Sequence, residues 1–253
     1  MKEALKKIIP QKTRLYIREK IIPSLARVDI AISRNFFGTK NKLYRRFLAN
    51  SIKKRGFQKI NIGCGPKGIK GWLNFGLFPS FRIPYGLVFK KNSIYYLNYD
   101  LSAGLPLKNN SIKHIYNSHF IEHLDLKEGI EFFKEVYRVL KPGGIIRTSC
   151  PDLEKYAQKY IERDLSFFKN KQIKEFCFYK EAHTPGEIFI AKAYDNINCH
   201  RWFYDKESLT HLLKKTGFKD IYPTKVHESK IKNITIIEPK YRAIESLYLE
   251  ARK

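Results

Sequence analysis

The chain has 253 residues, of which 43% are apolar, and a formal net charge of +25. This length and composition predict a folded globule with a sizeable core and exclude a disordered chain. The four cysteines lie far apart with no C-x-x-C pair, and no apolar run approaches the roughly 18 residues of a membrane helix. These features argue against a disulfide scaffold, a zinc knuckle and a membrane-spanning protein, so we expect a cytoplasmic location, with contact to a membrane surface as a further option.

Much of the positive charge lies at the start of the chain. Residues 1–58 hold 16 Lys and Arg against 3 acidic residues, and their pattern predicts a basic helical appendage that includes the amphipathic stretch "KNKLYRRFLANSIKKRG". Such a segment suits an anionic membrane surface, a nucleic acid or an acidic substrate, unless it reflects only a Lys-rich coding bias. We expect peripheral contact with an anionic membrane, because the stretch lacks the interleaved aromatic residues that stack bases.

Residues 59–253 predict one α/β domain with a mainly parallel sheet, since short apolar runs alternate with helical patterns. The clearest helix is "DLKEGIEFFKEVYRVL", which begins with a capping box of Asp125 and Glu128 and ends at "KPGG". Two further helices are expected over 152–168 and 205–218, with an irregular stretch between them at 171–200. Strands are expected near 59–62, 72–75, 94–99, 113–117 and 144–149, and a closing hairpin from 234–239 and 245–253.

A glycine motif follows the first predicted strand. Gly63, Gly65 and Gly68 satisfy G-x-G-x-x-G, the fingerprint in which a following helix points its N-terminus at a pyrophosphate. The next strand begins near residue 72, which leaves no room for that helix, since a full crossover needs about 10 to 12 residues. A phosphate-bearing cofactor would lose its main anchor here, whereas a cofactor without phosphate would not need one. A tight turn without a ligand is the alternative.

Five separated stretches carry a resemblance to a known family. "INIGCGPKGIKGWLNF", "YDLSAGLPLKNNSIKHIYNSHFIEHL", "EVYRVLKPGGIIRTSCPDLEKY", "HRWFYDKESLTHLLKKTGF" and "SLYLEARK" occur in this order. Together they resemble the class I S-adenosylmethionine-dependent methyltransferases, in a bacterial group related to the type 11 methyltransferases. The resemblance implies a Rossmann-like fold, with a mainly parallel seven-stranded sheet and a reversed C-terminal hairpin. It also implies that S-adenosylmethionine lies across the carboxyl ends of the first strands.

The resemblance also assigns cofactor-binding residues. Gly63, Cys64 and Gly65 would approach the methionine part of the cofactor. Asp100 and Leu101 would face its adenine, and Asn117, Ser118 and His119 would line the methyl-donor side. Gly76 departs from the family pattern, because the family has an acidic residue there for the ribose hydroxyls. The resemblance therefore implies weakened cofactor binding.

His119, Glu122 and His123 form H-x-x-E-H, which is also the inverted zinc-protease signature. That metal site needs both histidines on one face of a helix, whereas here the motif follows a strand and the helix begins only after Asp125. We therefore expect no metal. In a methyltransferase the same three residues would be catalytic, because a hydroxyl acceptor must lose its proton as the methyl group moves. The alternative role for each is to satisfy amides of the loop.

Two further places are candidates for acceptor contacts. Asp152 is expected to cap the following helix rather than to touch the acceptor. His200, Arg201 and Trp202 lie beside the 171–200 stretch, which would form a lid. An aromatic residue beside a cation and an imidazole suits a sugar or an anionic acceptor, with a buried aromatic corner as the alternative.

The sequence thus favours an enzyme that transfers a methyl group from S-adenosylmethionine to a hydroxyl or carboxyl acceptor. We expect the acceptor to be a glycan, a lipid-linked precursor or a small molecule. The alternative is a catalytically silent module of the same fold that docks on a membrane or nucleic acid through its basic surface.

Overall fold

The computed structural model describes residues 42–65, 68–78, 83, 85–175, 181–193 and 200–253. Its first helix, α4 (Lys42–Lys54), confirms the amphipathic helix predicted in the basic segment. Leu48 and Ile52 of α4 are buried in the main core. Residues 1–41 lie outside the described part, so the predicted boundary after residue 58 stays a prediction. None of the described helices is long and apolar enough to cross a membrane.

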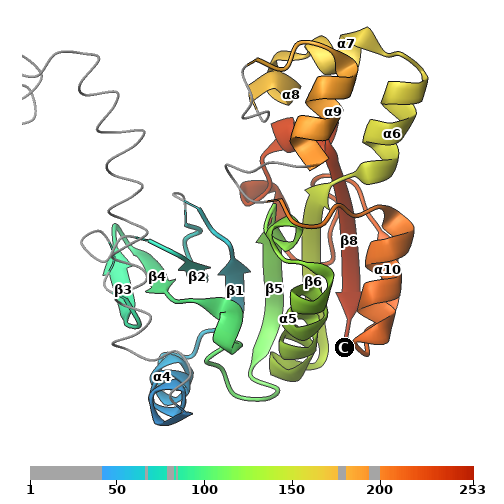
Figure 1. Cartoon of the computed structure of the whole chain (residues 1–253). Helices are drawn as coiled ribbons and strands as arrows, with labels where there is room; N and C mark the ends of the chain where they lie inside the picture. Colours follow the sequence, from blue (N-terminus) through green and yellow to red (C-terminus); the bar gives the residue numbers. More distant parts are fainter. Residues whose placement is uncertain (1–41, 66–67, 79–82, 84, 176–180, 194–199) are drawn as a thin grey trace, which may run out of the picture.

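An eight-stranded sheet forms the centre of the molecule, in the order β3-β4-β2-β1-β5-β6-β8-β7 (Figure 1). Neighbouring strands from β4 to β6 are parallel, whereas β3, β8 and β7 pair antiparallel. The strands are β1 (Lys59–Ile62), β2 (Leu73–Gly76), β3 (Val88–Lys91), β4 (Ile94–Asn98), β5 (Ile112–Ser118), β6 (Leu140–Pro151), β7 (Lys219–Pro223) and β8 (Ser246–Arg252). Without the edge strand β3, this is the predicted seven-stranded sheet with a reversed last hairpin.

The closing hairpin differs from the sequence prediction in one strand. β8 is confirmed, but its partner is β7 and not residues 234–239. Ile234–Ile236 instead form a 3-10 turn, entered through Asn233 in the left-handed conformation. Ile231 and Ile234 pack on Trp72, Tyr116 and Ile145 of the sheet, so the apolar residues of this stretch cover a face instead of extending it.

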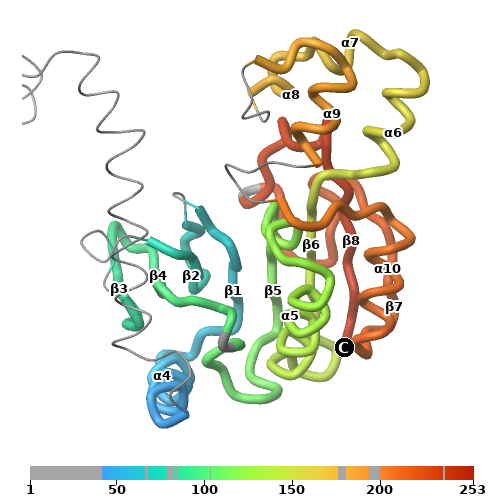
Figure 2. Tube along the Cα trace, in the orientation of Figure 1, coloured from blue at the N-terminus to red at the C-terminus, as the bar shows by residue number. Residues whose placement is uncertain are grey.

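Helices cover the other face of the sheet. α5 (Leu126–Val139) and α10 (Lys206–Lys215) pack there, as the tube in Figure 2 shows. The predicted capping box of α5 is confirmed: Glu128 N donates to the Asp125 carboxylate at 2.8 Å, and Asp125 N donates to the Glu128 carboxylate at 3.1 Å. The cap fixes where the loop after β5 ends, and so it positions the H-x-x-E-H segment.

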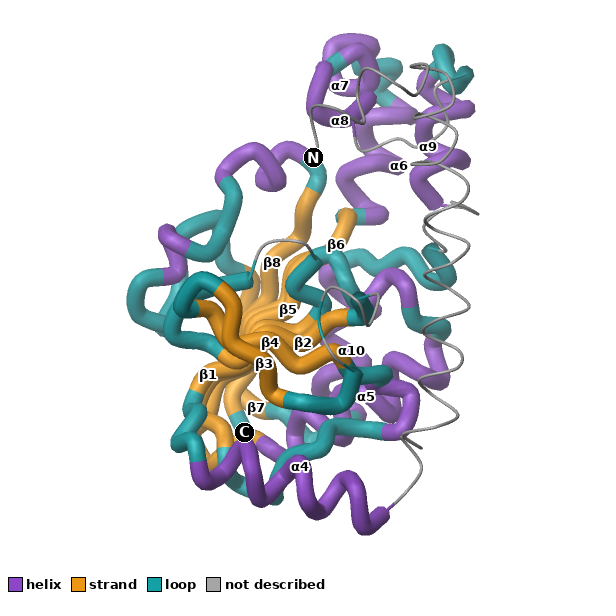
Figure 3. Tube along the Cα trace, turned by 90° about the vertical axis from the view of Figure 1, so that its left-hand side faces the viewer, coloured by secondary structure: helices purple, strands orange, loops and turns teal. Residues whose placement is uncertain are grey.

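In the described part of the chain, four helices between β6 and α10 form a cap beyond the carboxyl end of β6 (Figures 1 and 3). They are α6 (Leu153–Ile161), α7 (Leu165–Lys169), α8 (Lys171–Glu175) and α9 (Pro185–Ala193). The cap has its own small core, made of Tyr156, Phe167, Phe168, Ile173 and Ile188.

The cap corrects two predictions and confirms one. The helix expected over 152–168 is interrupted at Arg163, whose φ of 52° is left-handed, and Asp164 caps the next helix. The stretch expected to be irregular, 171–200, contains α8 and α9. Asp152 caps α6 as predicted, accepting from Lys155 N at 3.4 Å.

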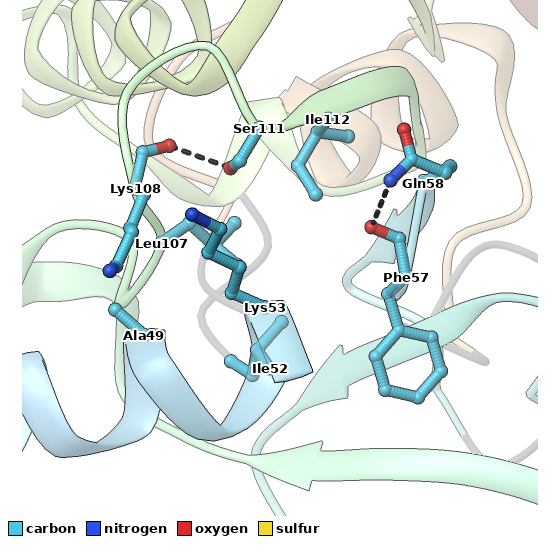
Figure 4. A pocket seen from close by; sticks show the side chains of 9 residues that line it. All are labelled: Ala49, Ile52, Lys53, Phe57, Gln58, Leu107, Lys108, Ser111 and Ile112. Atoms are coloured by element: carbon cyan, nitrogen blue, oxygen red, sulfur yellow. Dashed lines mark hydrogen bonds between the residues drawn. The ribbon is translucent and has the colours of Figure 1, made fainter. Parts of the chain in front are cut away.

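A small pocket of about 40 Å³ lies between the end of α4 and the loop before β5 (Figure 4). Phe57 and Gln58 precede β1, and Ile112 begins β5, so this pocket is at the amino ends of the strands. In an open parallel sheet ligands bind at the carboxyl ends. The pocket is therefore at the wrong edge, and too small, for a nucleoside cofactor.

Candidate functional site

The glycine turn after β1 is held open by backbone conformation. Gly63 and Gly65 have φ of 69° and 54°, a left-handed region that glycine adopts without strain. Cys64 N donates to Phe75 O at 2.9 Å, which ties the turn to β2. A Cβ on Gly65 would meet nothing within 4 Å, so the turn borders open space. Burial raises the pKa of the Cys64 thiol to about 12, so this thiol is not a nucleophile.

The other predicted cofactor residues lie at the same edge, because Ile62 is in register with Phe75 on one side and with Asn117 on the other. Asp100 follows β4 and accepts from Ser102 N at 2.9 Å, with Leu101 beginning the 3-10 turn between them.

Asn117 and Ser118 end β5. Ser149 Oγ donates to Ser118 Oγ at 2.9 Å. Asn117 is fully buried, and its Nδ2 has no hydrogen-bond partner among the described residues. A buried amide without a partner is a donor available to a ligand.

Gly76 ends β2 opposite Asn98. A Cβ at Gly76 would lie 2.7 Å from Cζ of Phe78 and 3.3 Å from Sγ of Cys64. The Phe78 ring therefore occupies the space into which an acidic side chain at this position would extend. Asn98 fixes the Phe78 backbone, since its Oδ1 accepts from Phe78 N at 3.0 Å and its Nδ2 donates to Phe78 O at 2.7 Å.

His119 follows β5 with a φ of 51°, a conformation that is uncommon for residues other than glycine and that concentrates at functional sites. Its Nε2 lies 2.8 Å from Ser246 Oγ, and its Nδ1 lies 3.2 Å from Oε1 of Glu122. A Cβ on Gly63 would lie 2.8 Å from Cδ2 of Phe120, so only glycine lets Phe120 approach this closely. This contact places the His119 segment directly beside the glycine turn.

Glu122 is buried, with 1% of its surface exposed. Burial alone would raise the pKa of its carboxyl, but contact with His119 and the imidazoles of His123 and His200 lower it to about 2. The carboxylate is therefore ionised. One potential metal-ligand atom from each of Glu122, His123 and His200 lies within 4.8 Å of the others.

A second buried carboxylate, Glu245, joins the cap to the sheet. It accepts from Tyr156 Oη at 3.0 Å and lies 2.8 Å from Nζ of Lys192, both in the cap, and Arg242 Nη1 donates to it at 2.8 Å. Burial raises its pKa, but Lys192 and the other cations bring it below the ordinary value. Glu245, Lys192 and Ser246 were not predicted as site residues, because none of them belongs to a local sequence motif.

The segment that follows His200 contacts the H-x-x-E-H turn. Arg201 N and Trp202 N donate to the carbonyl oxygen of Glu122 at 2.7 and 3.2 Å, and the Arg201 guanidinium pairs with Asp125 and Glu128. Trp202 keeps 40% of its surface exposed, so it is not the buried aromatic corner considered as an alternative.

A family model described as a methyltransferase domain, of type 11, matches residues 87–148. The matched stretch runs from β3 through β6 and contains Asp100, Asn117 and the H-x-x-E-H segment. The order of the strands is the one expected for the same family. Over these residues the chain is similar to the class I S-adenosylmethionine-dependent methyltransferases.

Solved structures give further similarities. A methyltransferase from Archaeoglobus fulgidus is 16% identical, with 88% of this chain and 98% of that chain covered and a TM-score of 0.45. A protein from Thermotoga maritima described as a possible histamine N-methyltransferase is 21% identical, with 87% and 93% covered and a TM-score of 0.44. Phosphoethanolamine N-methyltransferase 2 from Haemonchus contortus, solved with S-adenosyl-L-methionine, is 15% identical, with 81% and 52% covered and a TM-score of 0.42. No curated protein matches this sequence.

The residues at the carboxyl edge fit S-adenosylmethionine, the cofactor that the similarity to methyltransferases implies. The glycine turn borders open space, and the Asn117 amide has an unused donor. The fit is incomplete at Gly76, where no carboxylate is present and Phe78 fills the space. The structure therefore agrees with the sequence that this position offers no acidic side chain to the ribose hydroxyls.

Proposed function

We propose that this methyltransferase acts on an oxygen acceptor, a hydroxyl or carboxyl group on a glycan or a lipid-linked precursor. Support comes from the His119 and Glu122 pair beside the glycine turn. When bound, S-adenosylmethionine supplies an activated methyl group. A hydroxyl acceptor must also lose a proton, and an imidazole in contact with an ionised carboxylate can take it.

Within this proposal His119, Glu122 and His123 are the catalytic residues. Gly63, Cys64, Gly65, Asp100, Leu101, Asn117 and Ser118 hold the cofactor. Trp202, exposed beside the H-x-x-E-H turn, offers a flat surface on which a sugar ring can stack.

The test is transfer of a radiolabelled methyl group to glycan and lipid fractions. We expect label in an alkali-labile ester or in an alkali-stable ether. Label recovered as a methylated amine would contradict an oxygen acceptor.

In the same assay, His119→Ala should lower turnover by about 10²-fold or more while leaving cofactor affinity within about twofold. His211→Ala, an exposed histidine on α10, is the matched control. Equal losses of turnover and cofactor affinity in His119→Ala would contradict a catalytic role.

We also propose that the basic segment docks on an anionic membrane, supported by the outer face of α4. Leu43 and Phe47 are 77% and 59% exposed, and exposed cations lie along the same face, namely Lys42, Arg46, Lys53 and Lys54. Apolar side chains flanked by lysine and arginine are typical of helices that lie in the membrane interface.

Vesicle sedimentation tests this docking. Each cation near an anionic surface contributes about 1 kcal/mol, so Arg46→Gln with Lys53→Gln should weaken binding to anionic vesicles roughly 30-fold. Lys171→Gln, on an exposed site of the cap, should leave it unchanged. Binding that is insensitive to lipid charge and to salt would contradict the proposal, and preferential binding to nucleic acid would replace the membrane as the partner.

A further inference from the structure

We propose that Glu122, His123 and His200 bind a divalent transition-metal ion such as Zn²⁺ or Mn²⁺. The three side chains bring a carboxylate oxygen and two imidazole nitrogens within 4.8 Å of one another. Two ligands that each lie about 2.1 Å from one ion are at most about 4.2 Å apart, so a small inward rotation of the side chains closes the set. Two imidazoles with one carboxylate form a donor set that suits such ions.

The carboxylate of Glu122 supports the site because it is buried and has few hydrogen-bond donors around it. It is 1% exposed, and neither oxygen has a hydrogen-bond partner among the described residues. Nδ1 of His119 lies 3.2 Å from Oε1, and no described donor is hydrogen-bonded to Oε2. A buried carboxylate with so few donors is destabilised by the loss of hydration, and a bound cation offsets that loss.

The orientation of His200 supports the site independently. Its Nδ1 lies 2.8 Å from the carbonyl oxygen of Lys192, so Nδ1 carries the proton and donates it. The lone pair is then on Nε2, which is the arrangement found for metal-binding histidines whose second nitrogen is hydrogen-bonded to a carbonyl. Because Arg201 N and Trp202 N donate to Glu122 O, backbone hydrogen bonds keep this segment against the carboxylate.

This site departs from the expectation of no metal drawn from the sequence. That expectation considered His119 and His123 as a pair on one helix. The structure turns His119 toward Ser246 and brings His200, which lies 77 positions after His123, to the cluster instead. The centroids of the His123 and His200 rings are 5.0 Å apart.

A metal ion here would also bind the acceptor hydroxyl; this extension rests on the proposed function. An ion bound by three protein ligands keeps an open position, and a hydroxyl bound there loses its proton more readily. Glu122 and His123 would then act on the acceptor as ligands of the ion, and specificity for an oxygen acceptor would follow.

Metal binding is measurable without any acceptor. We would titrate the full chain, free of any affinity tag, with Co²⁺ and follow its visible absorption, then displace Co²⁺ with Zn²⁺. One equivalent should bind, and His200→Gln and His123→Gln should each weaken binding by about 100-fold or more. His211→Gln should bind like the unaltered protein. Absence of Co²⁺ and Zn²⁺ binding in the unaltered protein, or unchanged binding in both ligand variants, would overturn the site.

If a ligand variant fails to fold, imidazole nitrogen NMR of the unaltered protein decides. Zn²⁺ should shift two histidine signals, and both should persist in the single variants His114→Gln, His119→Gln, His183→Gln, His211→Gln and His227→Gln, which leaves His123 and His200. A shift confined to other histidines would overturn the site. Tight metal binding without methyl transfer would support the site and contradict the proposed function, whereas equal transfer by metal-free and metal-loaded protein would overturn only the extension to the acceptor.

Discussion

Replacing Arg147 with Met should lower the free energy of unfolding by about 3 to 5 kcal/mol, because it removes one partner from a buried ionic cluster. Arg147 is completely buried in β6. Its Nη2 donates to Glu238 at 2.7 Å, and its Nη1 lies 3.2 Å from Glu250 on β8. Burial would lower the pKa of Arg147, but these two glutamates raise it above its ordinary value. The Met variant would leave both carboxylates buried without their cation.

Chemical denaturation followed by circular dichroism measures this loss, which corresponds to a fall in melting temperature of about 2 to 4 °C per kcal/mol. Adding Glu238→Gln and Glu250→Gln to the Met variant should recover part of the stability, since it removes the unpaired charges. Lys134→Met, which breaks an exposed pair with Glu131 on α5, is the control and should cost about 1 kcal/mol or less. A loss of that small size at Arg147 would show that the cluster is not what fixes segment 224–238 to the sheet.

The double variant Gly76→Asp with Phe78→Ala should bind S-adenosylmethionine about tenfold or more tightly than the native protein. A carboxylate that accepts from ribose hydroxyls makes charge-assisted hydrogen bonds worth about 1.5 to 3 kcal/mol. The φ of Gly76 is outside the left-handed region, so the backbone accepts Asp, but the Phe78 ring lies 2.7 Å from the new Cβ. Gly76→Asp alone should therefore gain less than the double variant.

Calorimetric titration of four proteins separates the two effects. Phe78→Ala alone removes the ring without adding a carboxylate, and it should change affinity by less than the double variant does. Tight native binding that neither substitution improves would show that another group already holds the ribose. The account of Gly76 would then be wrong.

Local patterns predicted most of the fold. The capping box at Asp125 and Glu128 and the glycine stop fixed α5, and the parallel strands followed from short apolar runs between helices. The prediction of a strand at 234–239 was wrong because an apolar run such as "ITIIEP" can form a strand or pack across a face of the sheet equally well. Only the tertiary contacts of Ile231 and Ile234 with the sheet, together with the Glu238 and Arg147 pair, decide between them.

The sequence predicted correctly that the glycine turn and the ends of β4 and β5 lie at one edge of the sheet, because parallel strands end at the same edge. The acceptor side was less predictable. His119, Glu122 and His123 are adjacent in sequence, but their partners His200, Ser246 and Glu245 come from segments that meet them only in the folded chain. No spacing rule connects Glu122 with a histidine 78 positions later, so the cluster could not be found from the motif alone.

The cap and the sheet have separate cores, and Glu245 is one of the residues that join them. The cap has an aromatic core of its own around Tyr156, and the sheet has another. Glu245 is the point where Tyr156 and Lys192 of the cap meet a single residue of the sheet's C-terminal region. Local opening follows the weakest boundary between such units. We therefore expect the cap to open locally before the sheet does, with the carboxyl ends of β1, β2 and β4 staying folded.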